Sequence, residues 1–254
     1  MKQIPNLFTL LNLFFGCLAV IFTLQNGISV MYGPDGNQLV DMAERIWMAS
    51  LCIGLAAIVD FLDGFVARLF RASSPLGKQL DSLADLCSFG VAPGMILYQF
   101  LRMSYMNQKD GVDISMIWLL PALLVPCAAA YRLGRFNIDQ SQETSFKGVP
   151  APAAGLLVAS FPLIYWNAGN EWTVSLLLNK WFLYGFILLL CYLMVSRLPL
   201  MALKFKDYSV KSNLPKFILL AAAVVSAFFL KWLAVPVIFL FYIVLSLAFK
   251  NKTT

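Results

Sequence analysis

The sequence predicts an all-α integral membrane protein, a polytopic bundle of about eight transmembrane helices. Hydrophobic residues make up 60% of the 254 residues, and the mean hydropathy of the chain is +0.77. Soluble domains are less apolar, and a helix needs about 20 apolar residues to cross a bilayer. Apolar runs of about this length alternate with short polar segments, and we find neither a soluble second domain nor an internal repeat.

The predicted helices follow one another with short loops between them. The first is an uncharged run at residues 4–26, interpreted as a retained helix because no signal-peptide cleavage site follows it. After a polar, turn-rich segment at residues 27–44, a second helix runs from about residue 45 to residue 63 and beyond. Ser73, Ser74, Pro75 and Gly77 then indicate a loop. The remaining helices are expected at about residues 78–101, 114–135, 153–167, 180–197, 214–230 and 233–249.

The basic residues predict the orientation of the chain. If the amino terminus is cytoplasmic, 14 of the 19 lysines and arginines lie on the cytoplasmic side, as the positive-inside rule requires. All six tryptophans then lie at or beyond the outer boundary. We therefore expect a protein of the cell (cytoplasmic) membrane with both termini in the cytoplasm. The net charge of +6 is interpreted as a topology signal, and we expect no nucleic acid partner.

Four aspartates stand out because an acidic residue at a helix centre in a bilayer costs roughly 2.5–3.5 kcal/mol. Of the 13 acidic residues, only Asp60, Asp63, Asp81 and Asp85 lie within or at the ends of predicted spans. Residues three or four apart share one face of a helix, so Asp60 pairs with Asp63 and Asp81 with Asp85. Two antiparallel helices would bring both pairs together near the cytoplasmic face.

A divalent cation is the simplest compensation for such a cluster. Carboxylate oxygens suit a hard ion, so we expect Mg²⁺ or Mn²⁺ at these four aspartates. The chain has no histidine, which excludes an imidazole-ligated zinc site, and its five cysteines are scattered. Such a site at the cytoplasmic interface suits a substrate with a diphosphate head and lipid tails, because metal ions neutralise charge during phosphoryl transfer.

Neighbouring residues extend this interpretation. Arg68 lies one helical turn beyond Gly64 and is placed to bind a phosphate, while Gly64 leaves room for a nucleotide. In a chain without histidine, a carboxylate is the expected general base for an attacking hydroxyl group, and Asp85 is the last of the four.

Two alternatives stay open at this point. The aspartates could form a structural ion-pair cluster with Arg68, Arg71 and Lys78, or they could bind the cargo of a divalent-cation transporter. A transporter has no need for the glycines and the arginine at these spacings, and its acidic groups are expected nearer the middle of the membrane.

The spacing of these residues resembles that of a known family. Residues 60–85 read D-x2-D-G-x2-A-R-x8-G-x3-D-x3-D, the signature of the CDP-alcohol phosphotransferases, with a match at every fixed position. The resemblance covers about residues 1–213. It implies a six-helix transmembrane core over residues 1–213, with residues 214–254 as an additional C-terminal transmembrane hairpin.

The same resemblance implies roles for individual residues. Asp60, Asp63 and Asp81 resemble the metal ligands of the family, and Asp85 resembles its base and a further metal contact. The implied nucleotide and diphosphate site consists of Asn6, Thr9, Gly64, Ala67, Arg68, Ser74 and Gly77. The implied donor substrate is CDP-diacylglycerol, and the implied leaving group is CMP.

Two further segments resemble the membrane-embedded phosphatidylserine synthases of this family. They are residues 4–12, IPNLFTLLN, and residues 131–152, which contain YRLGRFN and FKGVPAP. This implies L-serine as the acceptor, with glycerol 3-phosphate or an inositol compound as the alternatives. Arg135, Asn137 and Lys147 are expected to hold the serine carboxylate. We also expect a homodimer among membrane lipids, with the last hairpin completing the packing or the oligomer interface.

Overall fold

The protein is described here by a computed structural model that covers residues 4–25, 28–32, 38–42, 45–69, 74–106, 114–138, 146–167, 171–201 and 210–249. Within these ranges the chain is helical apart from two short antiparallel strand pairs. Strand β1 (Ile28–Tyr32) pairs with β2 (Gln38–Met42), and β3 (Phe146–Lys147) pairs with β4 (Pro199–Leu200).

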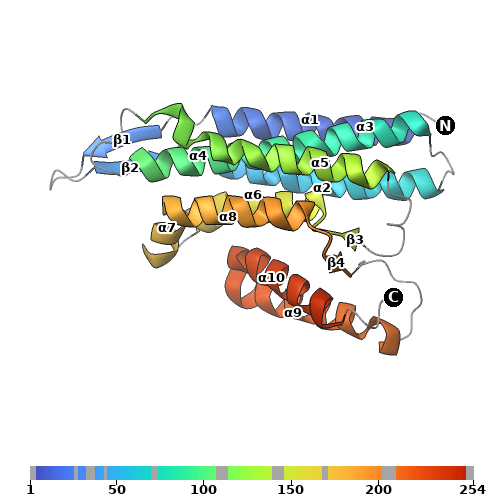
Figure 1. Ribbon diagram of the computed structural model, residues 1–254. Coiled ribbons are helices and arrows are strands. Elements are labelled where there is room, and N and C mark those ends of the chain that lie inside the picture. Colours follow the sequence, from blue (N-terminus) through green and yellow to red (C-terminus); the bar gives the residue numbers. More distant parts are fainter. Residues whose placement is uncertain are drawn as a thin grey trace.

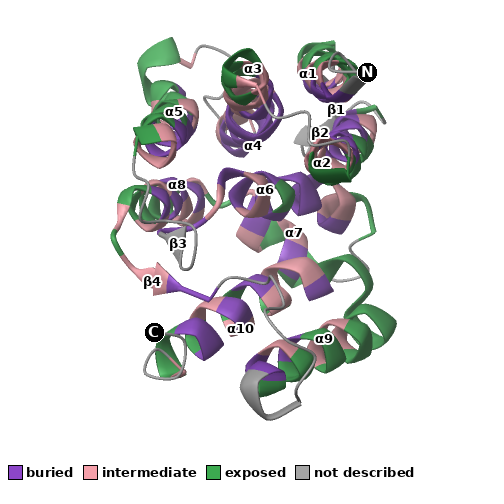
Figure 2. Cartoon of the chain, turned by 90° about the vertical axis from the view of Figure 1, so that its right-hand side faces the viewer, coloured by how far each residue is buried: buried purple, intermediate pink, exposed green. Residues whose placement is uncertain are grey.

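The helices lie in three tiers, seen from the side in Figure 1 and from one end in Figure 2. The first tier holds α1 (Ile4–Leu24), α2 (Ile46–Leu69), α3 (Pro75–Leu86), the π-helix η1 (Cys87–Val91), α4 (Ala92–Met106) and α5 (Leu124–Ile138). The second tier holds α6 (Ala151–Trp166) and α8 (Lys180–Val195), with α7 (Glu171–Leu177) at one end. The third tier is the hairpin of α9 (Val210–Leu230) and α10 (Ala234–Ala248).

The long apolar helices indicate an integral membrane protein. By length and composition, four described stretches are able to cross a membrane: Pro5–Leu24, Ile46–Leu69, Pro75–Met106 and Asn213–Ala248. The pair α7 and α8, bent by 61°, makes a fifth if it is one span. Helices occupy all eight predicted positions, and four or five of the described stretches are long and apolar enough to be candidate spans, so the crossing of the membrane by all eight helices stays a prediction. The last stretch folds back at Lys231 (φ 50°), which gives the predicted hairpin.

Several predicted boundaries are displaced for local reasons. Helix α3 begins at Pro75 and not at residue 78, because Ser74 Oγ accepts a hydrogen bond from Gly77 N (3.0 Å) and proline is well suited to the first helical position. The predicted helix at 114–135 begins instead as two 3₁₀ turns, Met116–Trp118 and Leu120–Leu123, with Pro121 in the second. Strands β1 and β2 occupy part of the predicted loop at 27–44, whose turn lies outside the described residues.

Small residues let the helices approach closely, as is common where helices pack within membranes. A Cβ atom added to Gly16 of α1 would lie 2.9 Å from the Cα atom of Ser88 in η1. A Cβ atom on Gly155 of α6 would lie 3.0 Å from the Cα atom of Phe89 on the same π-helix. The π-helix, which begins two residues after Asp85, is therefore packed tightly between α1 and α6.

Replacing Gly16 with alanine should destabilise the protein by about 1–3 kcal/mol, because the new methyl group forces α1 away from η1. The measurement is the thermal unfolding midpoint in detergent micelles. Gly54→Ala in α2 is the matched control, because no atom lies within 4 Å of its added Cβ. Equal midpoints for the two variants would show that α1 and η1 separate at no cost.

Candidate active site

Three of the four aspartates converge where α2 and α3 lie beside α1. Asp60 and Asp63 come from α2 and Asp81 from α3, and one carboxylate oxygen of each lies within 4.8 Å of the others. The predicted convergence of the two helices is thus confirmed for these residues. Two oxygen ligands of one cation, each about 2.0–2.6 Å from it, lie at most about 4–5 Å apart. The three carboxylates therefore fit a single divalent ion, which would also relieve their mutual repulsion.

Asp63 is held in place by α1. The hydroxyl of Thr9 donates a hydrogen bond to Asp63 Oδ2 at 2.8 Å, and both residues are buried. A partner that orients a carboxylate in this way resembles the outer shell of a metal site. Thr9 was predicted to contact the nucleotide. The structure shows a contact of Thr9 with Asp63, which the sequence did not predict.

Asp85 lies outside the set of three oxygens but is the most deeply placed polar group of α3. Its side chain is 8% exposed, and Asn12 Nδ2 donates a hydrogen bond to its Oδ1 at 3.2 Å. Asn12 is fully buried, and its backbone carbonyl accepts a hydrogen bond from Ser88 Oγ at 3.0 Å. This chain of contacts fixes Asp85 against α1. The metal contact predicted for Asp85 stays a prediction.

A cavity of about 290 Å³ opens beside the aspartates, between α1, α2 and α3. It is lined by six of the seven residues predicted for the nucleotide and diphosphate: Asn6, Thr9, Gly64, Ala67, Ser74 and Gly77. Pro5, Asp63, Lys78 and Asp81 complete the lining. Its size is at the lower end of the range for small-molecule sites, and its contact with Asp63 and Asp81 joins the predicted nucleotide site to the acidic cluster.

Arg68 is the predicted phosphate ligand that does not line this cavity. Its side chain is exposed in the last turn of α2. Lys78, which does line the cavity, donates a hydrogen bond from Nζ to the carbonyl of Asn137 at 3.1 Å. Lys78 therefore turns toward α5 rather than forming the ion-pair cluster considered from the sequence. Arg71, the third basic member of that cluster, lies outside the described residues.

The three predicted acceptor residues have different surroundings. Asn137 lies against α3, where its Nδ2 donates a hydrogen bond to Ser82 Oγ at 2.7 Å, one residue beyond Asp81. Arg135 instead turns to the end of α8 and donates to the carbonyls of Val195 (2.8 Å) and Ser196 (3.1 Å). The side chain of Lys147 lies outside the described part of the chain. The structure thus places Asn137 against α3, at the residue next to Asp81 in sequence, whereas the described contacts of Arg135 are with α8.

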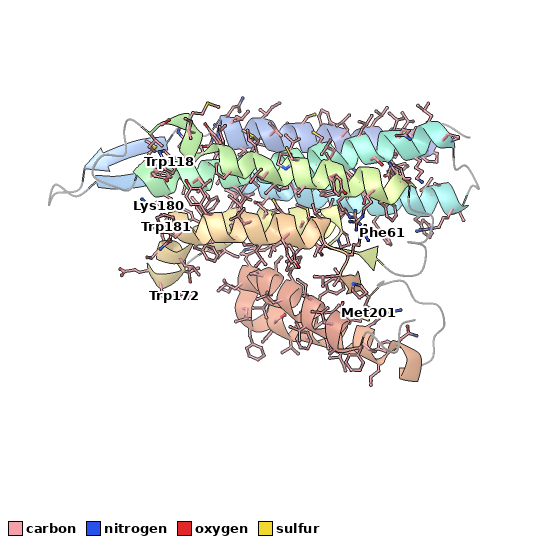
Figure 3. The ribbon with its side chains drawn as sticks, in the orientation of Figure 1. Phe61, Trp118, Trp172, Lys180, Trp181 and Met201 are labelled. Carbon is pink, nitrogen blue, oxygen red and sulfur yellow. The ribbon has the colours of Figure 1, made fainter. Side chains whose placement is uncertain are left out.

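The aspartates lie away from the tryptophan-rich end of the bundle. Figure 3 shows Trp118, Trp172 and Trp181 together at one end, whereas Phe61, the neighbour of Asp60 in sequence, lies toward the other. These tryptophans are 56%, 73% and 73% exposed. This separation agrees with the prediction that the tryptophans lie at the membrane boundary opposite the site.

The comparison with known proteins identifies the family to which this arrangement belongs. The sequence profile described as CDP-alcohol phosphatidyltransferase matches residues 2–196, which include all four aspartates and every residue lining the cavity. The chain belongs to the CDP-alcohol phosphatidyltransferase family. It is therefore a phosphatidyltransferase enzyme, and the family implies CDP-diacylglycerol and an alcohol as its substrates. The match ends before α9, so the final hairpin lies beyond the conserved family region.

Relatives of this CDP-alcohol phosphatidyltransferase share sequence over much of its length. It is 36% identical over 221 residues to the CDP-diacylglycerol–serine O-phosphatidyltransferase of Helicobacter pylori, covering 85% of this chain and 77% of that protein. The enzyme of the same name from Bacillus subtilis is 32% identical over 171 residues, 65% of this chain and 78% of that protein. The archaetidylserine synthase of Methanothermobacter thermautotrophicus is 29% identical over 162 residues, 63% and 58% of the two chains.

Asn12 and Lys78 join the site although neither was among the predicted site residues. For Asn12 a signal was present, because Asn6, Thr9 and Asn12 recur every three residues in the otherwise apolar first helix and share one face of it. For Lys78 the signal was its place directly after Gly77 in the loop between the two acidic pairs. Their contacts, Asn12 with Asp85 and Lys78 with the carbonyl of Asn137, form only where α1 and α5 pack against α3.

Proposed function

We propose that this protein transfers the phosphatidyl group of CDP-diacylglycerol to the hydroxyl group of L-serine, giving phosphatidylserine and CMP. The observation that carries the proposal is the shared acceptor of its relatives. Proteins from two bacteria, 32–36% identical to this chain, are named as serine phosphatidyltransferases, and an archaeal relative is named as an archaetidylserine synthase. The residues of segment 131–152 that resemble phosphatidylserine synthases support the same acceptor.

The geometry of the site supports a direct displacement at phosphorus. The serine oxygen bonds to the β-phosphorus of CDP-diacylglycerol, the bond from that phosphorus to the oxygen of CMP breaks, and CMP leaves with the electron pair. The proton of the hydroxyl group passes to Asp85, which Asn12 holds at 3.2 Å. The cytidine diphosphate is proposed to bind in the cavity beside Gly64, Ser74 and Gly77, with Arg68 as a further diphosphate ligand.

The remaining site residues prepare this displacement. Asp60, Asp63 and Asp81 are the proposed ligands of Mg²⁺ or Mn²⁺, with Thr9 fixing Asp63. When bound, such an ion supplies positive charge that neutralises a diphosphate and stabilises charge as a phosphoryl group transfers. The acceptor is proposed to bind where α5 lies against α3, near Asn137, while the roles of Arg135 and Lys147 in holding its carboxylate stay predictions from the sequence.

We also propose that the site faces the cytoplasm, with both chain termini on that side. The distribution of 14 of 19 basic residues supports this orientation. Cytidine nucleotides are available there. The family match over residues 2–196 supports residues 1–213 as the catalytic transmembrane core and residues 214–254 as an added hairpin.

A test of the acceptor uses the purified protein, CDP-diacylglycerol, Mn²⁺ or Mg²⁺, and a panel of alcohols. CMP release and the lipid product are measured with L-serine, glycerol 3-phosphate and myo-inositol. We expect release with serine and phosphatidylserine as the product. Release with glycerol 3-phosphate or inositol, and none with serine, would keep the family chemistry but reject serine as the acceptor.

A further inference from the structure

Arg132 in α5 carries a buried charge that the proposed chemistry has not used. Its side chain is only 6% exposed. Its Nε has no hydrogen-bond partner within the described ranges, and its guanidinium lies 5.4 Å from the centroid of the Phe136 ring. Leaving a buried donor of an ionised group without a hydrogen-bond partner is costly, so this Nε is expected to donate to an anion when the enzyme binds its substrates.

The packing of α5 places Arg132 at the depth of the base. Helix α5 runs antiparallel to the continuous helix α3–η1–α4, and three contacts fix their register. A Cβ on Gly94 would lie 2.8 Å from Cδ of Pro126, a Cβ on Gly90 would lie 3.0 Å from Cβ of Ala129, and Asn137 bonds Ser82. Interpolating between these contacts puts Arg132 opposite residues 87 and 88.

Two further observations connect Arg132 with Asp85, the proposed base for the serine hydroxyl group. Arg132 interacts electrostatically with Asp85, although no hydrogen bond joins the two side chains among the described contacts. From the other side, Asn12 of α1 reaches both Asp85 and Ser88. The base therefore contacts a buried amide, and a buried guanidinium on the neighbouring helix α5, whose Nε has no hydrogen-bond partner among the described residues, lies within electrostatic range of it.

An amino-acid acceptor needs a group that binds its carboxylate close to Asp85, and a cation suits this role. In serine the hydroxyl oxygen and the carboxyl carbon are three bonds apart, which is about 3–4 Å in space. If the hydroxyl group reaches Asp85, the carboxylate must lie within a few ångströms of the same residue. Arg132 is a buried cation at that depth, and a guanidinium fork matches a carboxylate in geometry.

Building on the proposed function, we propose that Arg132 binds the carboxylate of the acceptor amino acid and thereby sets the preference for serine. Arg135, the anchor expected from the sequence, already donates two hydrogen bonds to Val195 and Ser196 at the end of α8. The diphosphate of CDP-diacylglycerol has related anionic chemistry. That diphosphate is assigned to the cavity between α1, α2 and α3, whose lining does not include Arg132.

The test compares serine with serinol, which keeps the amine and a hydroxyl group but lacks the carboxylate. Wild type, Arg132→Gln and Arg135→Gln are assayed for CMP release, with serinol as substrate or as competitor. We expect Arg132→Gln to lower kcat/KM for serine by about 10–100-fold, the effect of losing a charged hydrogen bond. The values for serinol and the KM for CDP-diacylglycerol should change by less than about threefold. Arg132→Lys keeps the charge but loses the fork, and should retain part of the preference.

Three results would overturn the assignment. Equal losses for serine and serinol would make Arg132 a structural residue, and a raised KM for CDP-diacylglycerol with unchanged serine preference would make it a diphosphate ligand. Loss of the preference in Arg135→Gln, and not in Arg132→Gln, would restore the anchor expected from the sequence. Failure of the proposed function can be told apart from failure of the Arg132 assignment, because the wild type itself would then release no CMP with serine. If Arg132→Gln does not fold, Arg132→Lys carries the comparison.

Discussion

CMP release should fall by about 10³-fold or more when Asp81 is replaced by asparagine, since a bound metal supplies several kcal/mol of charge stabilisation in transfers of this type. Asp81 is the one cluster residue contributed by α3, and it also lines the cavity proposed for the nucleotide. Asparagine keeps the size of the side chain but removes its negative charge. The variant should therefore fold normally and bind a divalent cation far more weakly.

Binding of Mn²⁺, measured by electron paramagnetic resonance, separates this effect from a general loss of structure. The matched control is Glu171→Gln, which makes the same carboxylate-to-amide change on α7, where the glutamate is exposed. A chelator should abolish the activity of the wild type, and Mg²⁺ or Mn²⁺ should restore it. Unchanged Mn²⁺ binding in Asp81→Asn would place the ion elsewhere.

The acidic cluster could be predicted from sequence because its information is local. Asp60 and Asp63 share a helix face by spacing alone, and so do Asp81 and Asp85. Charged groups inside predicted spans already point to function, because the bilayer makes them costly. Ser74 and Gly77, which lie between the two pairs, then predicted a loop that turns the chain back and brings the pairs together. The structure confirms that convergence for the three residues Asp60, Asp63 and Asp81.

The sequence could not show in this way which of Arg132 and Arg135 is buried. Both are cations in one helix, three residues apart, in the segment that resembles phosphatidylserine synthases. In a soluble protein the apolar stripe would reveal which face is buried. In a membrane protein, faces toward lipid and faces toward other helices are both apolar, so Phe61 (69% exposed) and Phe89 (fully buried) look alike in the sequence.

The π-helix at Cys87–Val91 was not predicted from the sequence either. Gly90 lies within it and Pro93 and Gly94 follow it, but glycine and proline are also frequent in regular transmembrane helices, so they did not mark this position. Its position follows from tertiary packing, since α1 approaches it at Gly16 and α6 at Gly155. Such bulges often occur at functional sites. Here it begins two residues after Asp85, and its Ser88 donates to the carbonyl of Asn12, whose side-chain amide donates to the Asp85 carboxylate.

Asp85→Asn should reduce serine-dependent CMP release by about 10²–10⁴-fold, the usual loss when a general base is removed. The substitution keeps the shape of the side chain and its contact with Asn12, because an amide oxygen still accepts the hydrogen bond now made to Oδ1. Binding of CDP-diacylglycerol should persist, since Asp85 does not line the cavity proposed for the nucleotide.

Comparing Mn²⁺ binding in Asp85→Asn and Asp81→Asn separates a base from a fourth metal ligand. Asp81 belongs to the three oxygens within 4.8 Å of one another, and Asp85 does not. We therefore expect Asp85→Asn to bind Mn²⁺ clearly more tightly than Asp81→Asn while losing comparable activity. Equal weakening of Mn²⁺ binding would make Asp85 a metal ligand first, as the family resemblance also allows. Near-normal CMP release from Asp85→Asn would show that another group or a water chain accepts the serine proton.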